Sequence, residues 1–335
     1  MKQPRRLNRG DIMAKLTKTR EEILKSFKNL LSNDNADLKW QQTFRGTGLP
    51  YNAVTGKSYR GTNRIVLNMR CFFRGWSDNR FVTFNQAKKA GWKIKAESKA
   101  TPIEFWQWYD IKEKKYLDYE VVHRLIKEGR EEKDFRLYGN TYYVFNASQV
   151  EGIPELKVEN ELDVPVNEVI DKLSLNMHVP IIYDERGRCY YSPQKDEIHS
   201  PKVGDFIGEH ELNSTLLHEL AHSTGHPSRL NRDIVNAFGT ASYAKEELRA
   251  EIASAILSSY LPMEFSEKHM QNHSAYVYSW MQAIDKDPNE LFRAINDAES
   301  ISDYMLEKAE IKELKFEIAE VKETTNTFKP KKKAM

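Results

Sequence analysis

Two histidines four residues apart, with a glutamate beside the first, constrain this chain more than any other feature. They lie in the run LLHELAHSTGH at residues 216–226. On an α-helix this spacing places His218 and His222 about 40° apart around the axis and one turn apart along it, so both imidazoles can bind one ion. Glu219 is then placed to take a proton from metal-bound water, as a general base. Neutral imidazoles suit Zn²⁺, which lowers the pKa of bound water toward about 7 and polarises a scissile carbonyl. The run therefore predicts a helix that carries the zinc site of a hydrolase.

A catalytic zinc ion needs a third protein ligand and an open position. His226 lies eight residues after His218, about 12 Å further along a continuous helix, which is too far to complete the site. The helix expected over 243–260 offers Glu247 and Glu251 on one face. Glu251 lies among apolar residues, where a buried carboxylate needs a partner. We therefore expect Glu251 as the third ligand, with Glu247 as the alternative ligand or as a group that orients a histidine.

Charge is distributed very unevenly along the chain. Residues 1–100 contain 22 Lys and Arg against 7 Asp and Glu, a net charge of +15, whereas the remainder contains 29 against 42, a net charge of −13. Five of the six tryptophans also fall within the first 108 positions. A basic groove for phosphates combined with aromatic platforms for bases is typical of single-strand binding, each stacked base being worth about 1–3 kcal/mol. The first part of the chain is therefore expected to bind single-stranded DNA.

The candidate DNA contacts surround a Gly-rich turn and the segment that follows it. The first group is Arg45, Lys57, Tyr59, Arg60 and Arg64, and the second group is Arg74, Trp76 and Arg80.

Hydrophobic periodicity and turn residues predict an α+β chain. Helices are expected over 17–33, 84–91, 166–175, 209–224, 243–260, 272–284 and 288–310. Strands are expected within 92–110, 140–150, 179–185 and 188–201. The run at 65–73 is compatible with a helix or a buried strand, and the charged run at 118–135 is interpreted as an insertion or a loop.

The expected domains follow the change in composition. Residues 1–150 form a basic domain, 151–165 a linker, 166–310 a metallopeptidase domain and 311–335 a charged tail. Cys71 and Cys189 form no C-x-x-C pair, which excludes a thiolate zinc cage. No secretory signal and no apolar run of roughly 18 residues is found, so a cytoplasmic protein without a membrane span is expected. The chain has no complete nucleotide-binding loop, so it is neither a primase nor a helicase in itself.

Several long runs carry a family resemblance. The runs CYYSPQKDEIHSP, HELAHSTGHPSRLNR and FGTASYAKEELRAEIASAIL resemble the metallopeptidase domain of ArdC-type antirestriction proteins, which are related to the N-termini of TraC-type plasmid primases. The run HSAYVYSWMQAIDKDPNELFRAINDAESISDYML is similar to the C-terminal helices of that family. LPYNAVTGKSYRGTN and FVTFNQAKKAGWKIKAESKATPIEFW resemble its DNA-binding domain. The resemblance covers about residues 15–310.

The resemblance implies an N-terminal mixed α/β domain that binds single-stranded DNA, followed by a mainly helical, zincin-like metallopeptidase domain. It implies that His218, His222 and Glu251 bind Zn²⁺ and that Glu219 is the general base. The family commonly has Trp after the second histidine of the motif, whereas this chain has Ser223. We expect that difference to alter packing and not zinc binding.

Two functions are compatible with these observations. The first is a zinc metallopeptidase of a plasmid or another mobile element that binds single-stranded DNA and protects incoming DNA. Its protein substrate is unknown, with the host restriction machinery as one candidate. The alternative is a non-catalytic DNA-binding antirestriction protein with a structural or vestigial zinc site. His273 is a candidate for stabilising the oxyanion of a peptidase intermediate, and a packing role for it is equally compatible with the sequence.

Overall fold

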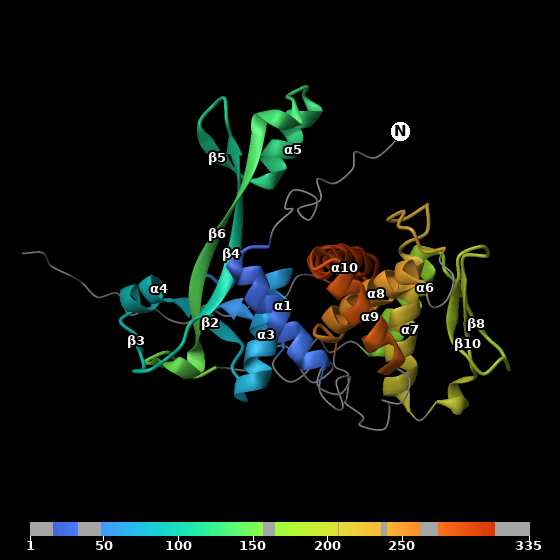
Figure 1. Ribbon diagram of the computed structural model, residues 1–335. Coiled ribbons are helices and arrows are strands. Elements are labelled where there is room, and N and C mark those ends of the chain that lie inside the picture. Colours follow the sequence, from blue (N-terminus) through green and yellow to red (C-terminus); the bar gives the residue numbers. More distant parts are fainter. Residues whose placement is uncertain are drawn as a thin grey trace, which may run out of the picture. The chain divides into compact units, whose positions relative to one another are not determined.

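The computed structural model describes residues 16–32, 48–156, 165–206, 208–235, 240–261 and 274–311. These residues form an α+β fold with two compact units (Figure 1). The first unit comprises the described parts of residues 1–50, 59–77 and 158–314, and the second comprises those of 51–58, 78–157 and 315–335. Each unit is therefore built from segments that are separated in the sequence.

The first unit is mainly helical. Its helices are α1 (Lys18–Leu31), α3 (Thr62–Arg74), α6 (Val166–Met177), α7 (Glu209–Ser223), α8 (Ala241–Ser258), α9 (Ser274–Lys286) and α10 (Asn289–Lys308). The run at 65–73, compatible with helix or strand from its sequence, lies in α3, where Ile65, Val66 and Leu67 are all buried. Burial of consecutive residues removes the helical periodicity that would have distinguished the two possibilities.

Helix α8 packs against both α7 and α10. Its buried apolar side chains include Leu248, Ile252 and Ile256, and Phe292 and Ile295 of α10 are also fully buried. Alanines separate many of these large residues along both helices, which allows close approach of the helix axes. The same helix α8 buries three carboxylates, at residues 246, 247 and 251, and burial of that kind requires compensating partners.

A small sheet lies beside α7. Strands β8 (Ile181–Tyr183), β9 (Tyr190–Ser192) and β10 (Glu197–Ser200) have the order β8-β10-β9, with β10 parallel to β8 and antiparallel to β9. Strand β9 is therefore an edge strand, and both β9 and β10 contact α7.

Helices α1 and α3 belong to the first unit, although they come from the basic N-terminal part of the sequence. The guanidinium of Arg20 lies 4.5 Å from the centre of the Phe292 ring, and the N–H of Gly61 donates to Glu299 at 2.7 Å. The compact units therefore do not coincide with the expected sequence domains 1–150 and 166–310, which remain a prediction about the organisation of the sequence.

The second unit is built on a five-stranded sheet with the order β1-β2-β6-β4-β5. Its strands are β1 (Tyr51–Asn52), β2 (Arg80–Thr83), β4 (Thr101–Asp110), β5 (Lys115–Leu117) and β6 (Phe135–Asn146). A second pair joins β3 (Lys93–Ile94) to β7 (Val150–Glu151). Helix α4 (Phe84–Lys89) begins with a capping box between Thr83 and Gln86. The long antiparallel pair β4–β6 extends as a ribbon that carries β5 and α5 at its far end (Figure 1).

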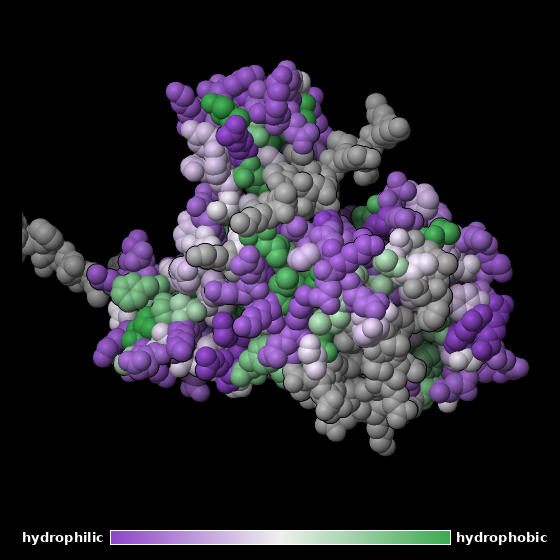
Figure 2. Space-filling model, viewed as in Figure 1, coloured by the Kyte–Doolittle hydropathy of each residue, from purple (hydrophilic) through white to green (hydrophobic). Residues whose placement is uncertain are grey.

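Of the two interpretations of 118–135, an insertion or a loop, the structure contradicts the loop. These residues form α5 (Tyr119–Lys127) and a short turn of 3₁₀ helix (Glu132–Asp134). Although most of the segment is charged, Val122 is completely buried, so the helix has one apolar face that packs at β4. Figure 2 shows that the outer surface at this end is mostly hydrophilic, which explains why the segment has the composition of a loop.

Within the described residues, no helix is both long and apolar enough to cross a bilayer.

Candidate metal site

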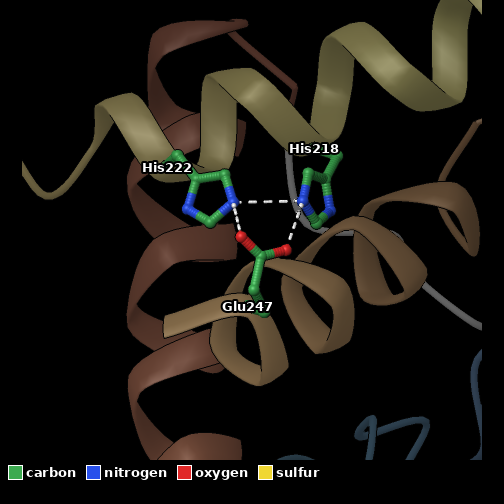
Figure 3. A group of neighbouring side chains, drawn as sticks. All are labelled: His218, His222 and Glu247. Carbon is green, nitrogen blue, oxygen red and sulfur yellow. Dashed lines mark hydrogen bonds and ion pairs between the residues drawn. The ribbon is translucent and has the colours of Figure 1, made fainter. Parts of the chain in front are cut away.

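Helix α7 presents the two histidines of the motif. Leu216, Leu217 and Leu220 are buried on its core side, which sets the rotation of the helix and turns His218 and His222 toward α8 (Figure 3). Both residues were expected on one helix, and the structure confirms that expectation.

The helix ends at Ser223, Thr224 is its C-cap, and Gly225 follows where the chain turns back. A Cβ on Gly225 would lie 2.3 Å from Cγ2 of Ile234 and 3.2 Å from the carbonyl oxygen of His222. Only glycine fits this close approach.

Three side chains converge on one point between α7 and α8 (Figure 3). The Nε2 atoms of His218 and His222 are 3.0 Å apart. Nε2 of His218 lies 3.4 Å from Oε2 of Glu247, and Nε2 of His222 lies 3.4 Å from Oε1 of the same carboxylate. Two zinc bonds of about 2.0–2.1 Å at the tetrahedral angle separate their ligand atoms by roughly 3.3 Å. The spacing of the three donor atoms is therefore that of a preformed metal site.

The preference for Glu251 as the third ligand is not supported by this geometry. Glu247, the alternative from the sequence, is the glutamate that lies near both histidine Nε2 atoms, whereas Glu251 lies 3.6 Å from Nδ1 of His218. The two glutamates are one helical turn apart, about 5.4 Å along α8. Glu247 lies at the height along α8 where it is near both Nε2 atoms. Glu251, one turn further along, is near only Nδ1 of His218.

Each histidine has a carboxylate at its second nitrogen. Glu251 faces Nδ1 of His218, and Glu246 lies 3.4 Å from Nδ1 of His222. Glu246 is held in turn by Arg232, whose Nη2 donates to its Oε1 at 2.7 Å. Such carboxylates commonly fix the orientation of metal-bound imidazoles. The sequence analysis missed Glu246 and Arg232, since nothing in the local pattern connects either to the motif.

The electrostatics of the cluster favour positive charge. Burial lowers the pKa of His222, but Glu247 and Glu246 outweigh it and raise that pKa to about 9. For His218, burial is likewise outweighed by Glu247 and Glu251, so its pKa lies well above the ordinary value. Burial raises the pKa of Glu247, and the two histidines overcome that effect and lower it. A site with this balance stabilises either protons on the imidazoles or a metal cation in their place.

Glu219 is held apart from the ligand cluster. The backbone N–H of Tyr191, on the edge strand β9, donates to Oε2 of Glu219 at 2.8 Å. That bond leaves the other carboxylate oxygen available for proton transfer.

Burial, together with Glu219, raises the pKa of the nearby Cys189 thiol, so Cys189 stays protonated and is suited neither to metal binding nor to nucleophilic attack.

The remaining residues of the motif region have other contacts. Nδ1 of His226 lies 2.7 Å from the hydroxyl oxygen of Ser228, so His226 is not part of the cluster. Ser223, where the family commonly has Trp, is buried and donates to the carbonyl of Leu220 at 2.7 Å. His273 lies outside the described residues.

The structure gives several of the candidate DNA contacts other partners. Arg64 is only 1% exposed and pairs with Glu299 at 3.4 Å, and Arg60 pairs with Glu299 and Asp303. Lys57 and Arg74 are exposed, Tyr59 and Trp76 are half-buried, Arg80 is buried against Asp78, and Arg45 lies outside the described residues. Arg60, Arg64 and Arg80 therefore neutralise carboxylates of this chain, which disfavours them as phosphate contacts.

Comparisons with known families match both halves of the chain. Residues 15–145 match the model of the N-terminal domain of anti-restriction factor ArdC, and residues 168–297 match the model of a zincin-like metallopeptidase.

Similar proteins include two DNA primases TraC of Escherichia coli. One is 37% identical over 274 residues, which is 80% of this chain and 25% of that protein, and the other is 36% identical and matched over 18% of its length. This chain therefore spans a quarter or less of those primases. An uncharacterised protein y4eC of Sinorhizobium fredii is 27% identical over 270 residues, 84% of its length.

Two solved structures of the antirestriction protein ArdC from plasmid R388 share the fold. The metal-free structure has a TM-score of 0.64 at 25% identity, and the Mn(II)-bound structure has a TM-score of 0.64 at 27% identity. Each match covers 88% of this chain and 98% of the other.

Proposed function

We infer the function of this chain from one premise: it is an ArdC-type antirestriction protein, with an ArdC N-terminal domain followed by a zincin-like metallopeptidase domain. We propose that it is a metal-dependent peptidase that also binds single-stranded DNA and protects incoming DNA of a mobile element. The observation that carries the peptidase proposal is the cluster of His218, His222 and Glu247 beside a glutamate that is held separately. A purely structural metal site has no use for such a base.

Zn²⁺ is the cation that the ligand set favours. Two imidazole nitrogens and one carboxylate form a common catalytic zinc set with an open fourth position. One of the two similar ArdC structures is a Mn(II)-bound form, so the metal requires direct measurement. We expect purified protein to contain about one equivalent of zinc, determined by elemental analysis. The assignment would be contradicted by protein that is purified with manganese and binds zinc no more tightly than manganese.

A bound cation would polarise the scissile carbonyl and acidify the attacking water. Glu219 accepts the proton of that water and can return it to the leaving amine. The N–H of Tyr191 holds Glu219 in place. Glu246 and Glu251 act only through the imidazoles, whose rings they orient.

The variant Glu219→Gln tests the peptidase proposal. It removes the base and leaves the three ligands intact, so we expect cleavage of a candidate host protein to fall by at least about a hundredfold while metal content is unchanged. Restriction protection in cells should fall in parallel. Glu209→Gln, at an exposed position of the same helix, is the matched control and should behave as wild type.

Equal protection by wild type and Glu219→Gln would contradict the peptidase proposal. Protection would then depend on DNA binding alone, as in the non-catalytic alternative.

A further inference from the structure

One face of the β4–β6 ribbon carries an array of exposed aromatic side chains. Residues that pair directly across an antiparallel ladder lie on the same face. Tyr138 pairs with Gln107, Tyr142 with Ile103, and Tyr109 with Tyr116 of β5. Alternate residues of a strand share a face, so five aromatic residues lie together on one face of the ribbon. We name this set the aromatic face: Phe105, Tyr109, Tyr116, Tyr138 and Tyr142.

This face is open to solvent, whereas the other face is buried at the same end of the ribbon. Phe105 is 47% exposed, and Tyr116, Tyr138 and Tyr142 are 54%, 42% and 46% exposed. On the opposite face, Trp108, Asp110 and Phe135 are all at most 5% exposed. An exposed cluster of large aromatic side chains on a regular sheet indicates a binding surface.

The rings form two groups along the ribbon. Phe105 and Tyr142 have ring centres 5.8 Å apart. Tyr109 lies 5.1 Å from Tyr116 and 5.8 Å from Tyr138. Four residues of β4 separate the two groups, about 13 Å along an extended strand. The face therefore offers two separate aromatic platforms.

Close packing and charged hydrogen bonds support the ribbon under these platforms from the opposite face. The ring of Trp106 packs so closely on Gly139 that a Cβ there would lie 2.7 Å from the ring. At the far end, Arg130 donates to both Asp110 and Asp134. A stiff support lowers the entropy lost when a flexible ligand binds.

The charges on this face are compatible with a polyanionic ligand. The other residues that the pairing register places on this face include Gln107, Arg136 and Asn140, and none of the paired positions from Ile103 to Tyr109 on this face holds a carboxylate. The paired positions of this face therefore present no carboxylate to a polyanion, and the exposed Arg136 offers one cation for a phosphate. Aromatic rings on a sheet that stack unpaired bases are a recurrent means of binding single strands.

We propose that the aromatic face stacks the bases of single-stranded DNA. The proposal rests on the DNA-binding function proposed above and names the surface that performs it. Stacking is tolerant of base identity, so the face would bind without sequence preference.

The test uses the full chain and a fluorescently labelled oligothymidine of about 30 nucleotides, long enough to span both platforms, with affinity measured by anisotropy at low salt. The double variants Phe105→Ala/Tyr142→Ala and Tyr116→Ala/Tyr138→Ala each remove one platform. Each should weaken binding roughly 5- to 150-fold, the range expected for losing one stacked base. Tyr143→Ala is the matched control, because Tyr143 is 60% exposed on the opposite face of the same ribbon; its affinity should equal that of wild type.

The outcomes separate this proposal from the function on which it rests. No binding by wild type would remove the DNA-binding function itself. Binding by wild type and unchanged binding by both double variants would overturn the aromatic face alone. A loss of restriction protection in cells with unchanged DNA affinity would also overturn it, in favour of a protein partner. Thermal melting of every variant checks that the exposed substitutions leave the fold intact.

Discussion

The metal cluster and the aromatic face use their residues in opposite ways. In the cluster, three side chains point at one another, and their ligand atoms lie within 4.8 Å. On the aromatic face, five side chains point outward from one sheet and do not converge. A metal ion needs ligands at one point, whereas a single strand needs repeated contacts along a line. Loss of one residue should therefore abolish the first kind of site and only weaken the second.

The largest expected effect lies in the cluster. Glu247→Gln removes a ligand, so zinc affinity should fall by more than about a hundredfold, beyond the roughly 10- to 100-fold loss expected for Glu251→Gln, which removes an orienting group. Competition with a chelator of known affinity measures both. If Glu251→Gln proved the more damaging, the sequence preference for Glu251 as ligand would be right after all.

The pH dependence of stability should change sign with metal. The pKa of His222 in the folded protein is raised to about 9 from 6.5. A raised pKa adds stability that is fully present below about pH 6.5 and is lost as the pH rises through about 9. Chelator-treated protein should thus melt at progressively lower temperature over that range. With excess zinc the trend should reverse, because the cation binds neutral imidazoles and competes with protons. Melting curves at intervals of about one pH unit across this window show the sign; identical trends in the two series would argue against a metal on these rings.

Phosphate contacts should be distinguishable from stacking by their salt dependence. Lys88 and Lys89 are exposed on α4, and their joint replacement by Ala should weaken binding several-fold. It should also lower the slope of log affinity against log salt by about 0.7 for each lost contact. The aromatic variants should keep the full slope. Lys286→Ala, at an exposed site of α9, serves as control. An unchanged slope in the lysine variant would exclude these two residues.

The smallest effects are expected where arginines are already paired. Arg60→Ala and Arg80→Ala remove side chains that neutralise carboxylates of this chain, so DNA affinity should change by less than about twofold per variant. Anisotropy with the same oligonucleotide measures this. A loss comparable to that of the aromatic variants would restore both arginines as DNA contacts.

Sequence reasoning succeeded where a site depends on one helix. His218, Glu219 and His222 are members of one spacing motif, so their relative placement follows from helical geometry. The choice between Glu247 and Glu251 depends on how α8 is rotated and shifted against α7, which no local pattern encodes.

The proposed DNA-binding surface was harder to predict, because the exposure of each side chain decides which residues a ligand can reach. Arg64 and Arg80 look like phosphate contacts in the sequence and are buried in the structure. Residues 101–110 place aromatic residues on both faces of one strand, so their pattern cannot show which face packs and which is free. The α5 segment, interpreted as an insertion or a loop, is a helix that packs at β4.

The contacts of α1 with late parts of the chain have a consequence for synthesis. Helix α1 packs against α3, which follows soon after it, but also against α9, and its Arg20 contacts Phe292 of α10. The earliest described helix to leave the ribosome therefore waits for about 270 further residues before the last of these partners exists. At the usual 5–20 residues per second, that delay is roughly 15–55 s. During it, the apolar stripe of Ile23, Phe27 and Leu30, which the finished fold buries completely, lacks part of its packing and is more accessible to chaperones and proteases. A nascent chain halted before α10 should therefore be degraded more readily than the finished protein.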